Sequence, residues 1–331
     1  MPLISVIVPF YNVRQYLKEC LDSLLNQTFR DIEIICINDG SSDDSGTILQ
    51  EYASKDPRIV PLTQENKGPA TARNIGLKVA KGKYISFVDG DDWINPETFA
   101  SLILLLTNDI DAVIFGVNLL EKKNKLLLEY FRPRFYGKLN MCGDIILATP
   151  ATVWNKIYRK DIIDKYEVSF PDGLLYEDNS FHWKYLMQTS SVYFHPAKLY
   201  NYRIQKDSIM SKTKGQHASE MDYLYVCREI FHYMKKYNLE QKYSQSFVEF
   251  FEFCLKIICA SDNPRKPMEL ANDIWSQIDI PTNNSIVRAI KQENYDYIIK
   301  WINYSFFEKI FSLKRRHGKK VITILGNQFQ L

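Results

Sequence analysis

The sequence predicts an α/β protein with a mostly parallel sheet flanked by helices, followed by a mainly α-helical C-terminal region. Two observations predict this class. Over roughly the first hundred residues, apolar runs rich in β-branched side chains alternate with amphipathic stretches of helical period. Clusters of polar residues then follow these runs. With 331 residues, 46% hydrophobic and 24% charged, the chain has the size and composition of about two folded domains.

The predicted strands are continuous apolar runs. They are Leu3–Pro9, Ile32–Ile37, Ile59–Leu62, Tyr84–Val88 and Ala112–Gly116. Runs of this kind are typical of strands that are buried on both faces. Because a β-α-β order makes neighbouring strands parallel, a ligand site is expected where their carboxyl ends meet.

Helices are expected in the intervals between these strands. Four leucines share one side of the first helix: Leu17, Leu21, Leu24 and Leu25. Two further helices are expected from about Ser45 to Tyr52 and from about Pro69 to Ala80. Asn95-Pro96 combines a capping residue with a proline at the first helical position, so it predicts the start of another helix.

The pattern is less regular between residues 120 and 202, although Ser191–Phe194 is β-like. Helical period returns from about Gln216, in Tyr223–Lys235 and Tyr243–Cys259.

The small, polar and basic stretch Ser211–Gly215 is expected to separate two parts of the chain. We therefore expect one domain over residues 1–212 and a helical region over residues 213–331.

Charge and hydropathy exclude several function classes. A net charge of +3 is too balanced for a bulk nucleic-acid binder. No apolar run approaches the roughly 18 residues of a membrane span, and the first residues do not resemble a secretory signal. The 6 cysteines form no C-x-x-C pair. These features favour a cytoplasmic protein with reduced thiols.

Chemically informative residues cluster where the predicted strands end. The clusters are Pro9–Asn12, Asn38–Asp43, Asn66–Asn74 and Asp89–Asp92. In an open α/β sheet they face one crevice, so their aromatic, amide, guanidinium and carboxylate groups predict a nucleotide-plus-metal site. The chain contains neither G-x-G-x-x-G nor G-x-x-x-x-G-K-[ST], which disfavours the usual dinucleotide and P-loop sites.

The run Asp89-Gly90-Asp91-Asp92 places three carboxylates within four residues. Such carboxylates raise one another's pKa unless a cation neutralises them, and a divalent cation with oxygen ligands does so. The alternative is a solvated acidic turn that caps the next helix.

Two further segments carry charged groups. Glu177-Asp178 is expected at a helix start, where the pair either caps the helix or supplies a general base. Tyr200–Arg203, with Ser208 and Ser211-Lys212, either clamps a phosphate or is an ordinary strand end.

In this order and spacing, the chain resembles the family 2 glycosyltransferases with a GT-A (Rossmann-like) fold over residues 1–212. The segments that carry the resemblance are Ser5–Asn12, Asn38–Asp44, Asn66–Gly76, Phe87–Asp92, Trp154–Arg159, Glu177-Asp178 and Tyr202-Arg203. The resemblance implies an inverting transferase with a nucleotide-binding half over residues 1–100 and an acceptor half over residues 101–212. It also implies a UDP-sugar donor and Mn²⁺ or Mg²⁺.

The resemblance assigns donor-binding roles by position. The residues implied to bind the nucleotide-sugar are Pro9, Tyr11, Asn12, Asp39, Asn66, Gly68, Arg73, Asp89, Gly90, Arg203 and Ser208. Tyr11 is expected to stack on uracil and Asp39 to bind its imide. Asn66, Gly68 and Arg73 are expected near the ribose and diphosphate.

Catalytic, metal and acceptor roles follow in the same way. Asp91 and Asp89, the D-x-D motif, would hold the metal with support from Asp92. Asp178 resembles the catalytic base, with Glu177 beside it. The floor of the acceptor site is expected from Trp154, Asn155 and Lys156. His217 is either a further metal ligand or a surface histidine.

The implied product is a cell-surface glycan of the polysaccharide, lipopolysaccharide, capsule or teichoic-acid type, built on a glycan or glycolipid acceptor. A sugar nucleotidyltransferase is an alternative, although Phe10–Arg14 lacks the glycine that a triphosphate loop would need. A non-catalytic nucleotide-sugar-binding module is a second alternative. The presence of Asp91, Asp178 and Arg203 argues against it.

Near the C-terminus, apolar residues recur at helical spacing before the basic run Lys314–Lys320. They are Ile299, Ile302, Phe306, Ile310 and Leu313. The pattern predicts a docking helix with a solvated basic end. A membrane-surface helix, giving peripheral membrane contact, and a homo-oligomer interface are alternatives.

Overall fold

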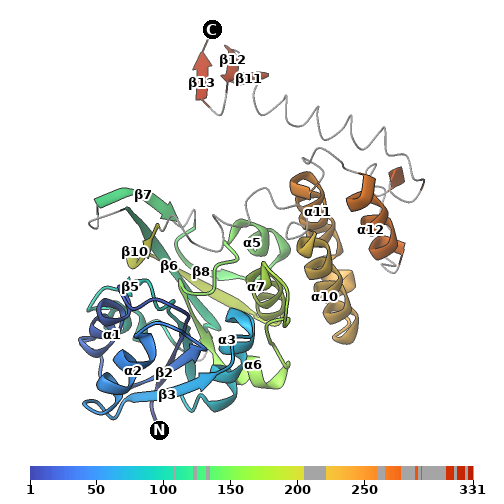
Figure 1. Ribbon diagram of the computed structural model, residues 1–331. Helices are drawn as coiled ribbons and strands as arrows, with labels where there is room; N and C mark the ends of the chain where they lie inside the picture. Colours follow the sequence, from blue (N-terminus) through green and yellow to red (C-terminus); the bar gives the residue numbers. More distant parts are fainter. Residues whose placement is uncertain are drawn as a thin grey trace. The chain divides into compact units, whose positions relative to one another are not determined.

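The computed structural model describes residues 1–107, 109–121, 125–131, 135–204, 221–258, 265–276, 288–289, 292, 311–316, 319–324 and 327–330 (Figure 1). The chain divides into two compact units. The first comprises Met1–Lys214 with Glu229–Ser246, and the second comprises Gly215–Arg228 with Phe247–Leu331. The division expected at residue 212 stays a prediction.

A 10-stranded mixed sheet forms the centre of the first unit. Its main path runs β3-β2-β1-β4-β9-β6-β10-β5, with β7 beside β6 and β8 beside β10. The strands are β1 (Ile4–Phe10), β2 (Ile32–Asp39), β3 (Ile59–Gln64), β4 (Tyr84–Phe87), β5 (Trp93–Ile94), β6 (Ala112–Glu121), β7 (Lys125–Phe131), β8 (Gly137–Asn140), β9 (Lys156–Arg159) and β10 (Ser191–Arg203).

The predicted α/β class is confirmed, and the sheet is parallel where the sequence alternates most regularly. Strands β3, β2, β1 and β4 are all parallel neighbours. Strand β9 then enters antiparallel between β4 and β6, whereas β10 is parallel to β6. All the residues of β1 and β2 are buried, as expected for strands covered on both faces.

Helices of the first unit flank this sheet. They are α1 (Leu17–Leu25), α2 (Ser45–Ala53), α3 (Gly68–Val79), α4 (Thr98–Ile103), α5 (Gly143–Ala148), α6 (Lys160–Lys165) and α7 (Glu177–Met187). Helix α3 packs on β1 and β2. A Cβ atom at Gly76 of α3 would lie 2.5 Å from Ile7 Cγ2, so the helix can approach β1 closely only with glycine there.

The helix start expected at Asn95-Pro96 is wrong. Helix α4 begins at Thr98, after Glu97. The Asn95 side chain instead donates to the Lys198 carbonyl at 3.2 Å and accepts from Asn201 Nδ2 at 2.9 Å. Asn95 therefore holds β10 in place and does not cap the helix.

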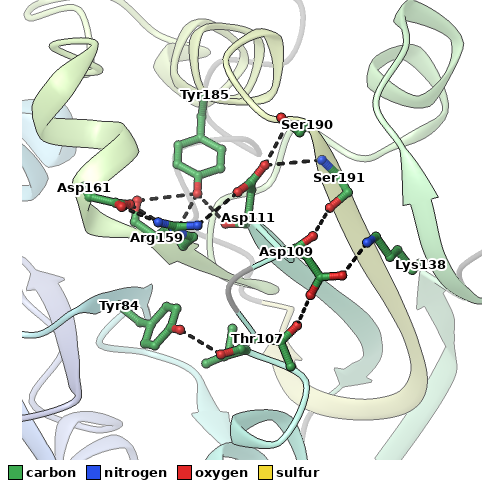
Figure 2. A network of polar contacts seen from close by, with 11 residues as sticks. Tyr84, Thr107, Asp109, Asp111, Lys138, Arg159, Asp161, Tyr185, Ser190 and Ser191 are labelled. Carbon is green, nitrogen blue, oxygen red and sulfur yellow. Dashed lines mark hydrogen bonds and ion pairs between the residues drawn. The ribbon is translucent and has the colours of Figure 1, made fainter.

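A polar network at the amino ends of β6 and β10 holds the C-terminal end of α7 (Figure 2). The Tyr185 hydroxyl of α7 donates to the Asp111 carbonyl at 2.5 Å and accepts from the Arg159 amide at 2.8 Å. The Asp111 carboxylate accepts from the Ser190 amide at 2.6 Å and pairs with Arg159 at 3.5 Å. Because one end of α7 is tied to the sheet, its other end, at Glu177, has a defined position.

The C-terminal half contains helices α10 (Asp222–Lys236), α11 (Glu240–Ile258) and α12 (Arg265–Ser276), which confirms the expected helical character. Helices α10 and α11 each contribute residues to both units. In the second unit, the Phe251 and Trp275 rings pack with their centroids 4.7 Å apart. None of the helices in the described part of the chain combines the length and the hydropathy of a membrane span.

The prediction that a helix continues through Leu313 is wrong, because Leu313 lies in a strand. Antiparallel strands β11 (Phe311–Arg316), β12 (Lys319–Ile324) and β13 (Asn327–Gln330) form a small sheet. Phe311 pairs with Ile324 of β12, whose residues 321–324 are all β-branched. The apolar residues Phe311 and Leu313 therefore have a strand as their partner. Part of the basic run, Lys314–Arg316, thus belongs to a strand. The remaining residues of the predicted stripe, from Ile299 to Ile310, lie outside the described residues.

Candidate active site

The loops after β1 and β2 are joined by Asn12. Its amide oxygen accepts from the Ser42 amide at 2.8 Å and the Asp43 amide at 3.3 Å. Its own backbone amide donates to Ser41 Oγ at 3.0 Å. Asn12 has a φ of 52°, in the left-handed region that asparagine tolerates better than most residues. The contact brings two of the expected strand-end clusters together.

Asp39, at the end of β2, holds the loop that leads into α3. Its buried carboxylate accepts from the Lys67 amide at 2.8 Å, the Gly68 amide at 2.9 Å and Gln64 Nε2 at 2.5 Å. Next to it, a Cβ atom at Gly40 would come within 2.8 Å of the Asn66 nitrogen. The role that these contacts give Asp39 is to shape the loop, and its expected contact with uracil stays a prediction.

Arg73 of α3 brings the two groups of acidic residues together. Its Nη2 lies 3.0 Å from Asp89 Oδ1. Its Nη1 lies 2.7 Å from Glu177 Oε1 and 3.2 Å from Asp178 Oδ1. The guanidinium is buried and also lies over the Phe170 ring, 5.5 Å from its centroid. One cation thus links the D-x-D motif to the predicted base.

The same helix fixes the segment that precedes α7. The Asn74 side chain donates to the Phe170 carbonyl at 2.9 Å and accepts from the Phe170 amide at 3.0 Å. Thr71 Oγ1 donates to Asp172 Oδ1 at 2.8 Å. The Asn66–Gly76 motif therefore has a positioning role, because its side chains hold both the Glu177-Asp178 pair and the chain that leads to it.

The Asp89–Asp92 turn is held by hydrogen bonds from β10. Asp92 is buried, and its carboxylate accepts from the Tyr200 hydroxyl at 2.8 Å and the Arg203 amide at 2.7 Å. A Cβ atom at Gly90 would lie 2.5 Å from Phe10 Cβ, so only glycine fits against β1. The alternative of a solvated helix-capping turn is wrong for Asp92, since α4 starts after Glu97 and this carboxylate faces β10.

Burial and neighbouring carboxylates raise the pKa values of the acidic groups. Burial, reinforced by Asp89, raises the pKa of Asp91 to about 6. Burial also raises the pKa of Asp92 well above its usual range. The pKa of Asp178 rises to about 7 because burial, with Glu177 and Asp89, outweighs the opposing effect of Arg73.

These carboxylates fit a divalent metal. Asp89 and Asp91 offer hard oxygen ligands, and burial, followed by the neighbouring Asp89, raises the pKa of Asp91, so a bound cation would favour its ionised form. In the part of the chain that the structure describes, no group of three or more His, Cys, Asp or Glu side chains gathers as a complete metal site. Mg²⁺ commonly takes one or two carboxylates together with substrate phosphates, which is the number available here.

Arg203, at the end of β10, lies beside the acidic turn. Its Nη2 is 2.6 Å from Glu19 Oε2 and its Nε donates to the Asp91 carbonyl at 3.0 Å. The guanidinium lies over the Tyr16 ring at 4.7 Å and the Trp93 ring at 4.5 Å. The expected diphosphate contact stays a prediction. The sequence did not reveal Glu19, Tyr16 or Trp93 as its partners.

The three residues expected under the acceptor are inside the protein. Asn155 and Lys156 have 0% exposure, and Trp154 has 5%. Lys156 Nζ binds the Pro150 carbonyl at 2.8 Å and also the Thr152 carbonyl, and burial lowers its pKa to about 7. These side chains can support an acceptor surface from below, and that role stays a prediction.

The other predicted site residues are placed less closely together. Pro9 is buried within β1, whereas the Tyr11 and Asn66 side chains are exposed. Exposure of the Tyr11 ring leaves it accessible to a base that would stack on it. Ser208 and His217 lie outside the described residues.

Comparisons with known proteins identify the family of the chain. The profile of glycosyl transferase family 2 matches residues 5–167. The glycosyltransferase EpsJ of Bacillus subtilis, described as uncharacterized, is 36% identical over 220 residues, which are 63% of each chain. Glycosyltransferase GlyG of Streptococcus pneumoniae is 33% identical over 63% of this chain and 73% of its own length. The chain belongs to glycosyl transferase family 2.

The family membership confirms the resemblance, and a solved structure confirms the fold. S. aureus TarS 1-349, in a complex with UDP-GlcNAc, aligns with a TM-score of 0.62 at 18% identity, covering 99% of this chain and 98% of that one. At this identity the likeness supports the GT-A-type fold alone. The family 2 profile ends before Glu177, so the α7 and β10 residues of the site lie beyond it.

Proposed function

We propose that this family 2 protein transfers a hexose or N-acetylhexosamine from a UDP-sugar to a hydroxyl group of a glycan acceptor, with inversion at the anomeric carbon. The acceptor would belong to a cell-surface polymer of the polysaccharide or teichoic-acid type. One observation carries the proposal. Arg73 unites Asp89 with Glu177 and Asp178, which lie about a hundred residues further along the chain. The S. aureus TarS complex with UDP-GlcNAc supports the choice of donor.

In this reaction Asp178 would accept the proton of the attacking hydroxyl. A carboxyl group whose pKa is raised to about 7 is a stronger base than an ordinary aspartate and is still partly ionised at neutral pH. Arg73 Nη1, 3.2 Å from Asp178 Oδ1, would keep that carboxylate oriented and would stabilise its ionised form. A single displacement from the face opposite the leaving group inverts the anomeric centre, and charge develops on the departing diphosphate.

Two groups would balance that charge. Asp89 and Asp91 would hold Mn²⁺ or Mg²⁺, which when bound neutralises charge on the diphosphate. Arg203, whose Nε lies 3.0 Å from the Asp91 carbonyl oxygen, would add a guanidinium beside the turn.

The first test is a calorimetric titration of UDP into the protein with and without Mn²⁺. Metal-dependent binding is expected, followed by UDP release from one UDP-sugar when an acceptor is present. Absence of UDP binding in both conditions would overturn the donor assignment.

The second test separates a transferase from a binding module. Asp178→Asn keeps the shape of the side chain but removes its basicity, so UDP binding should persist while transfer falls by about 10²- to 10⁴-fold. Near-normal turnover would exclude Asp178 as the base. Binding without any turnover in the wild-type protein would favour a non-catalytic module.

A sugar nucleotidyltransferase remains the alternative enzyme, and it would release diphosphate from a nucleoside triphosphate. The described loop after β1 is organised by Asn12 and contains no glycine, which favours the transferase. Membrane-surface contact through the basic C-terminal residues and association of two copies stay hypotheses.

A further inference from the structure

We propose that Tyr200 is a positioning residue that sets the geometry of the Asp89–Asp92 turn from its buried side. The proposal deepens the proposed function, because this turn carries the predicted metal ligands. Tyr200 lies on β10, more than a hundred residues from the turn in sequence, and its hydroxyl group contacts the turn.

The hydroxyl group binds both ends of the turn. It donates a hydrogen bond to Asp92 Oδ2 at 2.8 Å and accepts one from the Asp89 amide at 3.2 Å. One oxygen atom therefore bridges the first and last residues of the turn, which the Asp92 amide also joins by donating to the Asp89 carbonyl at 3.0 Å. Asp91 lies between these two anchored residues, and its placement follows from theirs.

Other contacts restrict where that oxygen can be. The Tyr200 side chain has 0% exposure, and its ring stacks on Trp154 with centroids 4.3 Å apart and planes 21° apart. Trp154 in turn stacks on Tyr202 at 5.5 Å. The backbone of Tyr200 pairs with Ile94, just beyond the turn. A ring that is held on its face and through its backbone has little freedom to move its hydroxyl group.

The contacts also explain why a buried aspartate is tolerated at position 92. Its two carboxylate oxygens accept from Tyr200 and from the Arg203 amide, the latter at 2.7 Å. Without the hydroxyl group, one carboxylate oxygen and the Asp89 amide would each lose their partner. A buried group that loses its partner favours a rearrangement that restores contact with water.

The test compares two variants that each remove one buried tyrosine hydroxyl group. Tyr200→Phe removes the contact with the turn. Tyr84→Phe is the matched control, because Tyr84 is also buried and donates to the Leu106 carbonyl at 2.8 Å, but lies at the opposite end of β4 from the turn. Residue-resolved hydrogen exchange is measured on both variants and on the wild-type protein, without ligand.

In Tyr200→Phe, the amides of Asp89 and Arg203 are expected to exchange about tenfold faster than in the wild-type protein, whereas Tyr84→Phe leaves them unchanged. Unchanged exchange in Tyr200→Phe, or equal acceleration in both variants, overturns the proposal. Where Tyr200→Phe does not fold, Trp154→Leu removes the stacked face and should accelerate the same two amides.

A second readout connects the turn to donor binding. Mn²⁺-dependent UDP affinity should fall about tenfold in Tyr200→Phe and stay at the wild-type value in Tyr84→Phe. Failure of the wild-type protein to bind UDP would refute the donor assignment, while the exchange result would still decide the role of Tyr200. Wild-type UDP affinity in Tyr200→Phe, with metal dependence intact, contradicts the proposal.

Discussion

Arg73 compensates three carboxylates with one buried guanidinium. Its planar group offers donors in two directions, so Nη2 binds Asp89 while Nη1 binds Glu177 and Asp178. A lysine has a single charged nitrogen and cannot span the same set. Nearby negative charges raise the Arg73 pKa further, so the guanidinium keeps its charge at any relevant pH.

Loss of Arg73 should therefore affect both folding and binding. Arg73→Gln removes the buried cation shared by Glu177, which is buried, and by Asp89 and Asp178, which are partly exposed, and it should lower the free energy of unfolding by about 3 kcal/mol. Urea unfolding at pH 7 measures the change. Arg58→Gln is the control, because Arg58 pairs with Asp56 away from the site at a partly exposed position, and should cost much less. Equal costs for the two variants would refute the special role of Arg73.

The raised pKa of Asp178 predicts how activity depends on pH. The base must be ionised, so kcat/KM should rise with pH and level off above an inflection near pH 7. Activity should be lost as the pH falls, because protonation removes the acceptor for the hydroxyl proton. A pH profile of kcat/KM measures this, and a rate that stays constant from about pH 5 to pH 8 would contradict it.

At the scale of single residues, the sequence placed the candidate site residues at the strand ends but did not reveal their partners. Strand ends converge in any open α/β sheet, so the clusters at Asp39 and Asp89 could be placed together. The pairing of Arg203 with Glu19 could not, because it joins side chains 184 residues apart and depends on how α1 packs. Asp172 was missed for the same reason.

Helix α3 is the element that joins the two halves of the site. Gly76 lets it approach β1, Arg73 extends from it to the acidic groups, and Asn74 holds the chain before α7. Removing any one of these residues alters a different part of the site.

Asn74→Ala should loosen the approach to α7. Its amide group makes two hydrogen bonds with the Phe170 backbone, at 2.9 Å and 3.0 Å. Loss of both should lower the free energy of unfolding by about 1–3 kcal/mol and reduce turnover more than UDP affinity. Denaturant unfolding and steady-state kinetics measure these effects. Asn74→Asp keeps an acceptor for the Phe170 amide, so its loss of stability should lie between those of the wild-type protein and Asn74→Ala. If Asn74→Asp is as destabilised as Asn74→Ala, the hydrogen bond from the Phe170 amide contributes little.

Element boundaries could be predicted where local pattern and tertiary contacts agree. The runs that became β1, β2 and β4 are mostly apolar, and every residue of these strands is buried in the structure. The prediction failed at Asn95, where contacts with β10 override a local capping signal. It also failed at Phe311–Arg316, where a β-hairpin partner decides the structure and the spacing of apolar residues does not.

For the whole molecule, the first compact unit includes residues well beyond the end of the family profile. Glu229–Ser246 belongs to it although the profile ends at residue 167. The Tyr233 hydroxyl donates to the Tyr166 carbonyl at 3.0 Å, and the Tyr243 hydroxyl donates to the Met187 carbonyl at 3.3 Å. A Cβ atom at Gly143 would overlap Ser246 Oγ, which indicates how closely α5 and α11 approach.

A chain truncated before Glu229–Ser246 should therefore be less stable than one truncated after this segment. A chain that ends at residue 212 loses part of the first unit and should unfold at a lower temperature than one that ends at residue 258, the last residue of α11. Thermal unfolding followed by circular dichroism compares the two. Equal midpoints would indicate that Glu229–Ser246 adds nothing to the stability of that unit.

The shared guanidinium of Arg73 also has a consequence for how this protein can change by mutation. Substitutions at Asp89, Glu177 and Asp178 draw on the same partner, so their effects should be strongly non-additive, and neutralising one carboxylate should be less harmful after Arg73 itself has been replaced. Epistasis of this kind closes most single-step evolutionary routes through these four positions. A directed-evolution library aimed at a new donor sugar should vary them together and leave single substitutions to the surrounding loops.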